Sequence, residues 1–132
     1  MVNKRGYEGG IRMTKGLKTF VINVLRRASY KWKPKSEALS LAKEKVGEYS
    51  TGRAKYAYRC RACGGLFKRK EINVDHIDPV VPLKGFKSGL EFDFNEYIVR
   101  LFCKKEGFQV LCKPCHDKKT KKENQIRRKN KP

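Results

Sequence analysis

Two Cys-x-x-Cys pairs constrain this chain more than any other feature of its sequence. Cys60 and Cys63 form the first pair, Cys112 and Cys115 form the second, and Cys103 stands alone. An odd number of cysteines argues against a closed disulfide framework, and pairs of this kind in a reducing compartment are typical of metal sites. A two-residue spacer lets both thiolates of a pair reach one ion at about 2.3 Å. The two pairs together therefore predict one tetrahedral, structural Zn²⁺ site.

The residues around the pairs favour zinc over the alternatives, which are a redox disulfide and unpaired core cysteines. Gly64 and Gly65 follow the first pair, and Pro114 lies inside the second, so each pair has the residues of a turn. Because the pairs are far apart in the sequence, one ion would close a long loop and organise the core. Cys103 lies in a helical apolar pattern and is interpreted as a plain buried thiol.

The charge of the chain is strongly unbalanced. It carries 33 Lys and Arg residues against 13 Asp and Glu, a net charge of +20 on 132 residues. Such a charge indicates a polyanionic partner, and we expect DNA. No apolar run approaches the roughly 18 residues that span a bilayer, and the N-terminus lacks the apolar block of a signal peptide. We therefore expect no membrane partner and a cytoplasmic location.

The length fits one domain, and four segments of the chain differ in composition. Residues 1–13 are Gly-rich and basic and are predicted to form a flexible arm. Residues 14–52 are predicted to hold an N-terminal helical element and a linker. Residues 53–126 are predicted to form the functional core, and residues 127–132 a basic tail.

Two helices are predicted within the N-terminal element. Thr14 is the expected N-cap of the first, whose apolar residues recur at helical spacing. Pro34 is expected to open the second helix and Gly47 to end it, with residues 50–52 as a linker. The apolar faces comprise Leu17, Phe20, Val21, Val24, Leu25 and Ala28 in the first helix, and Ala38, Leu41, Ala42, Lys45 and Val46 in the second.

Short strands and turns are predicted from residue 56 onward. Residues 71–77 alternate enough between apolar and polar side chains to indicate a strand. Asp93 is expected to cap a helix, with Glu96 as its capping-box partner. The remaining predicted elements are a loop at 83–90, a strand at 108–111 and a final helix that begins at Pro114 and gives way to the tail by about Arg127.

The two histidines of the chain fall next to these elements. His76 follows Asp75 at the end of the 71–77 strand, and His116 directly follows the last cysteine. If one ion gathers both cysteine pairs, both histidines approach one cleft. A carboxylate and two imidazoles on a basic surface suit phosphodiester hydrolysis, because two groups hold a divalent cation and one deprotonates water. The alternatives are a solvated His76, Asp75 as a strand-end cap and His116 as a residue of the zinc site's surroundings.

The order of these motifs resembles the zinc-containing HNH endonucleases, and most of all the small phage-encoded ones. The matching motifs are Cys60-x-x-Cys63, Val74–Pro79 and Gln109–Thr120, and the similarity runs roughly from Leu25 to Glu123. The resemblance implies an α+β fold in which a ββα-metal core, stapled by the four-cysteine zinc site, carries the N-terminal helical element. It also implies hydrolysis of DNA by nicking or double-strand cleavage, in the host cytoplasm if the chain is phage-encoded.

Carried over residue by residue, the resemblance implies that His76 is the general base. Asp75 and His116 would hold one catalytic divalent ion, Mg²⁺ or Mn²⁺, separate from the structural Zn²⁺. The implied products carry a 5′-phosphate and a 3′-hydroxyl. A phage replication or packaging protein is a candidate partner, and the oligomeric state stays open. We predict DNA contacts from Arg26, Arg27, Arg59, Arg61, Lys118, Lys119 and Lys122.

One position departs from the family pattern. The family's middle Asn stands nine residues before the last His, where this chain has Gly107. Such an Asn holds the loop and orients the base, so the residue that positions His76 is open, with Asn95 and Glu106 as candidates. The main rival function is a non-catalytic, zinc-dependent nucleic-acid-binding module, and a third class is an RNase or toxin that uses the same site.

Overall fold

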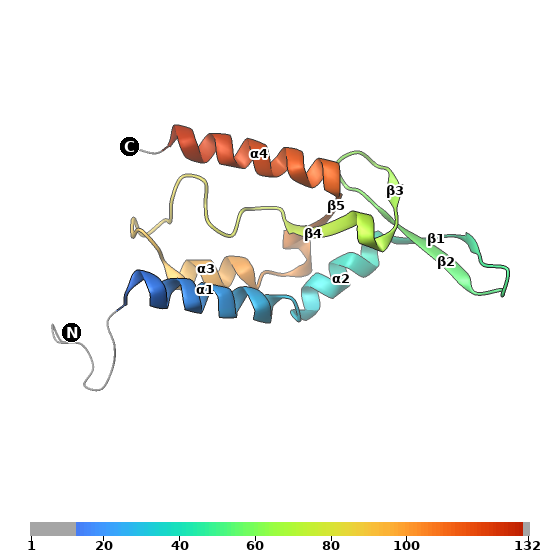
Figure 1. Ribbon diagram of the computed structural model, residues 1–132, viewed down its shortest axis with the longest axis horizontal. Coiled ribbons are helices and arrows are strands. Elements are labelled where there is room, and N and C mark those ends of the chain that lie inside the picture. The colour runs from blue at the N-terminus through green and yellow to red at the C-terminus, as the bar shows by residue number, and fades with distance from the viewer. Residues whose placement is uncertain (1–12, 131–132) are drawn as a thin grey trace.

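The computed structural model describes residues 13–130 of the chain (Figure 1). These residues form an α+β structure with four α-helices and antiparallel strands, which confirms the expected fold class at that level. The predicted flexible arm, apart from Met13, and the last two residues lie outside the described residues. The elements in chain order are α1 (Lys15–Ser29), α2 (Lys33–Ala42), β1 (Lys43–Glu48), β2 (Ala54–Arg59), β3 (Leu66–Phe67), η1 (Arg69–Glu71), β4 (Ile72–His76), α3 (Phe94–Leu101), η2 (Lys105–Gly107), β5 (Phe108–Cys112) and α4 (Lys113–Lys129).

The strands form two antiparallel sheets. β1, β2 and β3 make the first, in which β1 and β2 form a hairpin that projects from one end of the molecule (Figure 1). β4 pairs with β5 from Ile72 opposite Cys112 to His76 opposite Phe108. α4 begins directly after Cys112, so it runs back along β4 and its first two turns reach Asp75 and the His76 backbone.

Two small clusters of buried side chains form the core. The first surrounds the cysteines and joins Cys60, Leu111 and Cys112 to Phe67 and Cys115. The second lies between α1, α3 and the loop that precedes α3. It comprises Phe86, Tyr97 and Leu101, with Ile22, Leu25, Val80, Phe92 and Phe102 packed against them. Neither cluster is large, which fits the expectation that a metal ion supports the fold.

The first predicted helix is confirmed, but its apolar face is only partly buried. The Thr14 hydroxyl accepts a hydrogen bond from the Leu17 amide, as an N-cap should. Ile22 and Leu25 pack on the second cluster, whereas Phe20 is 62% exposed and Val24 is 43% exposed. The reason is that α1 lies at the edge of the molecule and buries the narrow stripe that meets α3 and its flanking loop.

The second predicted helix ends earlier than expected. It stops at Ala42 rather than at Gly47, and Lys45 and Val46 belong to strand β1. β1 pairs with β2 across the turn at residues 50–52, where the Gly52 amide donates to the Tyr49 carbonyl and Gly52 has a φ of +84°. The predicted division between residues 52 and 53 falls in this turn. This division stays a prediction. The strands on either side of it, β1 and β2, pair with each other.

The prediction for the helix that Asp93 caps is confirmed in part. The Asp93 carboxylate accepts from the Glu96 amide at 3.1 Å. The Glu96 carboxylate does not complete a capping box, because it accepts from the Lys87 amide at 2.9 Å and from Arg100 Nε at 2.8 Å. Glu96 therefore fastens the preceding loop to α3 instead of closing the helix end.

The final helix is longer than predicted. α4 continues to Lys129 instead of giving way to a tail by about Arg127. Arg127 donates to the Val81 carbonyl and the Asn130 amide group donates to the Leu83 carbonyl. These contacts hold the last turns of α4 against the 77–93 loop. The predicted strands at 71–77 and 108–111, and the predicted loop at 83–90, agree with the structure.

Candidate metal centre and adjoining cleft

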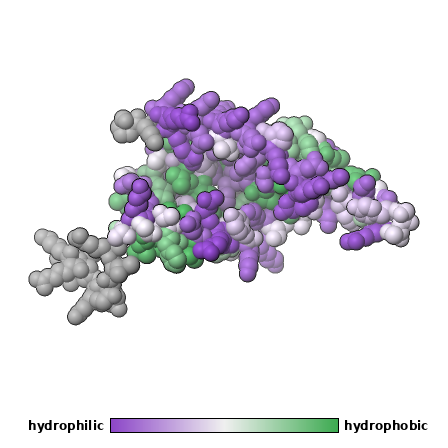
Figure 2. Space-filling view, viewed as in Figure 1, coloured by the Kyte–Doolittle hydropathy of each residue, from purple (hydrophilic) through white to green (hydrophobic). Residues whose placement is uncertain are grey.

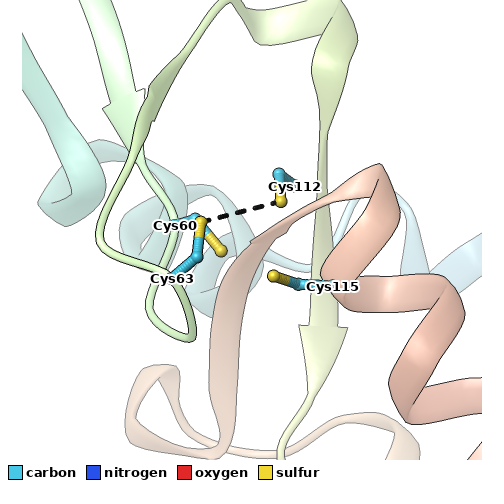
Figure 3. Close-up of side chains that lie close together, drawn as sticks. All are labelled: Cys60, Cys63, Cys112 and Cys115. Carbon is cyan, nitrogen blue, oxygen red and sulfur yellow. Dashed lines mark hydrogen bonds between the residues drawn. The ribbon is translucent and has the colours of Figure 1, made fainter.

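The four paired cysteines lie together, as their spacing predicts. Their sulfur atoms all lie within 4.8 Å of one another, and Cys63 Sγ is 3.9 Å from Cys112 Sγ. Figure 3 shows the four side chains converging from the turn after β2 and from the junction of β5 and α4. Thiolates bound at about 2.3 Å to one tetrahedral ion lie about 3.8 Å apart. The cluster is therefore compatible with a structural Zn²⁺ ion.

Backbone hydrogen bonds shape the turn that carries the first pair. The Gly64 amide donates to the Cys60 carbonyl at 2.9 Å, and the Cys60 amide donates to the Gly65 carbonyl at 2.8 Å. Gly64 has a φ of +75°, a conformation that favours glycine. The Arg61 amide donates to the Val110 carbonyl at 2.9 Å, so the turn is fastened to β5, which ends in the second pair.

The environment of the cluster pushes the thiol pKa values apart. Burial alone would raise the pKa of Cys60, but backbone hydrogen bonds at Cys63, Cys112 and Ala62 outweigh it and lower the pKa to about 6. Hydrogen bonding to the Cys112 thiol, together with burial, raises the pKa of Cys115 to about 12. Cys60 therefore ionises readily whereas Cys115 resists ionisation, and a cation is what would let all four become thiolates.

Cys103 lies apart from this cluster. It is half-buried just after the end of α3, and burial raises its pKa above the ordinary value. Its carbonyl accepts a hydrogen bond from the Trp32 indole at 2.7 Å, which ties the start of α2 to the end of α3. All five cysteines are free thiols in the structure, in agreement with the expectation of a reducing compartment.

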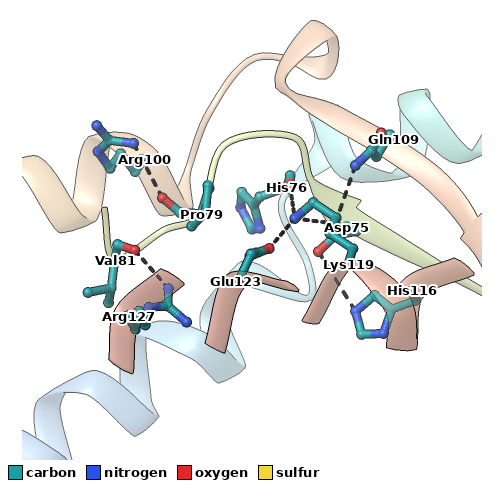
Figure 4. Close-up of polar contacts among 10 residues, drawn as sticks. All are labelled: Asp75, His76, Pro79, Val81, Arg100, Gln109, His116, Lys119, Glu123 and Arg127. Atoms are coloured by element: carbon teal, nitrogen blue, oxygen red, sulfur yellow. Dashed lines mark hydrogen bonds and ion pairs between the residues drawn. The ribbon is translucent and has the colours of Figure 1, made fainter. Parts of the chain in front are cut away.

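Asp75, in β4, and His116, in the first turn of α4, lie close together. His116 Nε2 lies 3.8 Å from Asp75 Oδ1 (Figure 4). Ligands at 2.0–2.2 Å from an octahedral cation lie about 3 Å apart when adjacent and about 4 Å apart when opposite. The pair is therefore close enough to share one divalent ion. The other carboxylate oxygen of Asp75 forms an ion pair with Lys119 Nζ at 2.9 Å and accepts a hydrogen bond from Gln109 Nε2 at 3.4 Å.

His76 lines the same cavity as Asp75, a space of about 470 Å³ that also borders Lys35, Lys119 and Glu123. Its Nε2 lies 2.9 Å from the Leu101 carbonyl oxygen at the end of α3. Since a carbonyl only accepts, this contact places the proton on Nε2 and leaves Nδ1 as the acceptor nitrogen. Burial lowers the pKa of His76, against the opposing effect of that carbonyl, so the imidazole is neutral at pH 7.

The backbone of Gly107 supports this histidine. The Ile77 amide, next to His76 in the chain, donates to the Gly107 carbonyl at 2.9 Å. The Phe108 ring lies with its centroid 4.7 Å from that of the imidazole. Asn95 and Glu106 are exposed and make no hydrogen bond to His76 within residues 13–130. The groups that position His76 are therefore the Leu101 carbonyl, the Gly107 backbone and the Phe108 ring.

The residues predicted to contact DNA are spread over three surfaces. Lys118 and Lys122 are exposed on α4, whose surface is covered by hydrophilic side chains in the view of Figure 2. Arg26 and Arg27 are exposed on α1, where Arg26 also borders the cavity. Arg61 is exposed in the first cysteine turn. These five cations are therefore available to a ligand.

The other two residues of that prediction are engaged within the protein. Arg59 pairs with Glu44 and donates to the Gly64 carbonyl. Lys119 pairs with Asp75 and Glu123. Any contact of these two side chains with DNA would compete with their internal partners.

Three charged residues that border the cavity are not among the predicted site residues, namely Lys35, Glu123 and Arg127. Lys35 in α2 borders the cavity, and burial, followed by the charge of Arg69, lowers its pKa. Glu123 holds Lys119 at 2.5 Å, and the ion pairs of Lys119 outweigh its burial and raise its pKa. Glu123 lies four residues after Lys119 on the same helix, a spacing that could have indicated the pair. No such signal exists for Lys35, whose place depends on the packing of α2.

Comparisons with known proteins do not identify a family: no family model matches the chain, and no curated protein or solved structure matches it. The HNH resemblance therefore stays a prediction. Within residues 13–130, no helix is both long enough and apolar enough to cross a membrane.

Proposed function

We propose that the protein is a metal-dependent endonuclease of the HNH type, which hydrolyses DNA phosphodiester bonds. The observation that carries this proposal is the approach of His116 to Asp75, at 3.8 Å, beside the half-buried imidazole of the neighbouring residue His76. The order β4, β5, α4 supports it, because two antiparallel strands place Asp75 and His76 at one cavity and the helix that follows brings His116 to Asp75. The family resemblance of the sequence motifs points to the same chemistry.

Asp75 and His116 would hold the catalytic divalent ion, Mg²⁺ or Mn²⁺, and the four paired cysteines would hold a separate structural Zn²⁺. The catalytic ion would supply positive charge at the scissile phosphate. The donors suit this ion, since a carboxylate oxygen is the hard ligand that Mg²⁺ prefers and imidazole accepts several divalent metals.

His76 would act as the general base. A neutral imidazole takes a proton from water, and Nδ1 is the nitrogen free to do so while Nε2–H donates to the Leu101 carbonyl. That carbonyl is at the C-terminal end of α3, where the helix dipole is negative. It therefore stabilises the imidazolium that forms when the proton arrives, and it orients the base as the family's middle Asn is expected to do.

One observation favours the rival function, a zinc-dependent nucleic-acid-binding module without catalysis. Lys119 Nζ lies 2.9 Å from Asp75 Oδ2, 3.2 Å from the His76 carbonyl oxygen and 2.5 Å from Glu123. A lysine in this position neutralises Asp75 without any metal ion. Both functions need zinc and a basic surface, so the deciding experiment must measure cleavage.

The test is the conversion of supercoiled plasmid to nicked circles and linear DNA by the zinc-loaded protein, with Mg²⁺ or Mn²⁺ added. The informative variant is His76→Gln, because the amide keeps a donor for the Leu101 carbonyl but cannot accept the proton. We expect its nicking rate to fall by roughly 10²–10⁴-fold, with zinc content, melting temperature and DNA affinity close to the parent. Asp75→Asn and His116→Gln should also lose activity, and raised Mg²⁺ should restore part of it in these two variants only.

Two results would contradict this proposal. Parent-like nicking by His76→Gln would remove the general base assigned here. A folded, zinc-loaded parent protein that binds DNA but cuts it with neither ion would make the binding module the function of the chain.

A further inference from the structure

The projecting hairpin carries a second basic groove, distinct from the cavity at Asp75. The groove has a volume of about 860 Å³ and shares no lining residue with that cavity. Its wall is formed by β1, β2, the turn between them and the segment before β4. Six exposed cationic residues line it, and no acidic residue does: Lys43, Arg53, Lys55, Lys68, Arg69 and Lys70.

The acidic residues of the hairpin are already paired and do not offset this charge. Glu44 accepts two hydrogen bonds from Arg59, at 2.5 and 2.8 Å, and Glu48 accepts one from Lys45 at 3.2 Å. The cations of these two pairs, Arg59 and Lys45, do not line the groove. The groove cations therefore lack acidic partners on the hairpin, and a polyanion would be the complementary ligand.

Tyrosine rings lie among the cations. Tyr49, Tyr56 and Tyr58 line the groove, and Tyr49 and Tyr56 are 52% and 47% exposed. Lys43 Nζ lies 4.2 Å from the Tyr56 ring centroid, and Lys55 Nζ lies 5.5 Å from that of Tyr49. Exposed aromatic rings beside cations form a surface on which nucleobases can stack while the cations contact phosphates.

We infer that this hairpin groove binds a single-stranded segment of nucleic acid, through phosphate contacts to the cations and base stacking on Tyr49 and Tyr56. A basic groove with aromatic side chains is the arrangement that holds unpaired strands with little sequence preference. A paired duplex would offer phosphates but few free base faces, so the tyrosines favour the single strand. The inference does not rest on the proposed nuclease activity, since a non-catalytic module would use the same groove.

The experiment measures binding of fluorescein-labelled oligothymidine of about 16 nucleotides, and of a duplex of equal length, across a salt titration without added divalent ion. The charge variant replaces Arg53, Lys55, Lys68 and Lys70 with Gln. Its matched control replaces Lys15, Lys31, Lys84 and Lys104, which are also exposed but lie outside the groove, with Gln. The aromatic variants are Tyr49→Ala, in the turn, and Tyr56→Ala and Tyr56→Phe, in β2.

We expect the charge variant to lower the salt slope for oligothymidine by about 3, close to 0.7 for each of four lost contacts, and the control to lower it by less than 1. Each Tyr→Ala change should weaken oligothymidine binding by roughly 5- to 150-fold, and Tyr56→Phe should keep it because the ring remains. Duplex binding should change little with the aromatic variants.

Three results would overturn the inference. The charge variant and its control could weaken oligothymidine binding equally, which would make the effect one of net charge. Folded Tyr49→Ala and Tyr56→Ala proteins could bind oligothymidine like the parent, which would leave only duplex or non-specific phosphate contact. The groove variants could lose binding to phosphatidylserine vesicles but not to oligothymidine, which would make the groove a membrane contact. A melting curve for each variant shows whether the protein is folded, so that lost binding is not confused with unfolding. Tyr49 lies outside the strands, so Tyr49→Ala removes no side chain from the hairpin's paired residues.

Discussion

Gly107 packs so closely on Cys103 that one added methyl group tests the arrangement around His76. A Cβ placed on Gly107 would lie 2.7 Å from Cys103 Sγ and 3.1 Å from Cys103 Cβ. The backbone itself would accept a side chain, since Gly107 is not among the glycines with positive φ in residues 13–130. Steric overlap with one thiol is therefore the obstacle to Gly107→Ala, and the Asn of the family pattern would be larger still.

The size of the effect follows from this contact. Overpacking by one methyl group typically costs about 1–3 kcal/mol, which lowers the Tm of a domain of this size by roughly 4–15 °C. Cys103→Ala removes the sulfur and leaves only the 3.1 Å contact. We therefore expect Gly107→Ala alone to be destabilising, and the Gly107→Ala, Cys103→Ala double variant to recover most of the loss. The coupling should amount to about 0.5–3 kcal/mol.

The assay is thermal and urea unfolding of the parent, both single variants and the double variant, each loaded with zinc. Zinc content should be equal in all four, because neither residue belongs to the four-cysteine cluster. The same cycle can be repeated for Gly107→Asn, which should fold well only with Cys103→Ala. Additive effects of the two substitutions, or a Gly107→Ala protein as stable as the parent, would refute the packing argument.

Two further predictions concern stability. Cys63 and Cys112 lie 49 positions apart, and by analogy with a disulfide an ion that joins them removes about 4 kcal/mol of chain entropy from the unfolded state. Cys112→Ser should therefore lose zinc and melt far below the parent, whereas Cys103→Ser should keep zinc; equal zinc content and Tm in both would exclude a structural ion. Trp32→Phe keeps the ring that meets Phe102 edge-on, with centroids 5.4 Å apart, but loses the indole donor to the Cys103 carbonyl. It should destabilise the protein by about 1 kcal/mol in urea unfolding, and no change would mean that water replaces the indole at that carbonyl.

Local patterns in the sequence determined the features whose partners lie close in the chain. Two cysteines three positions apart share a turn, so the pairs Cys60–Cys63 and Cys112–Cys115 were readable as metal ligands before the fold was known. The N-caps Thr14 and Asp93 were readable for the same reason, since each accepts from an amide three residues on. The approach of Asp75 to His116 was inferable too, but only as a consequence of joining the cysteine pairs.

The tertiary structure decided whatever depends on groups that are distant in the chain or that belong to the backbone. Residues 43–48 fit a helix pattern as well as a strand, and pairing with β2 made them a strand. Lys119 belongs to a run of basic residues for which we predicted DNA contacts, whereas in the structure it pairs with Asp75. The partner of His76 is the carbonyl of Leu101, a group that every residue carries. Sequence patterns report side-chain type and local spacing, whereas these contacts depend on where packing brings separate segments together.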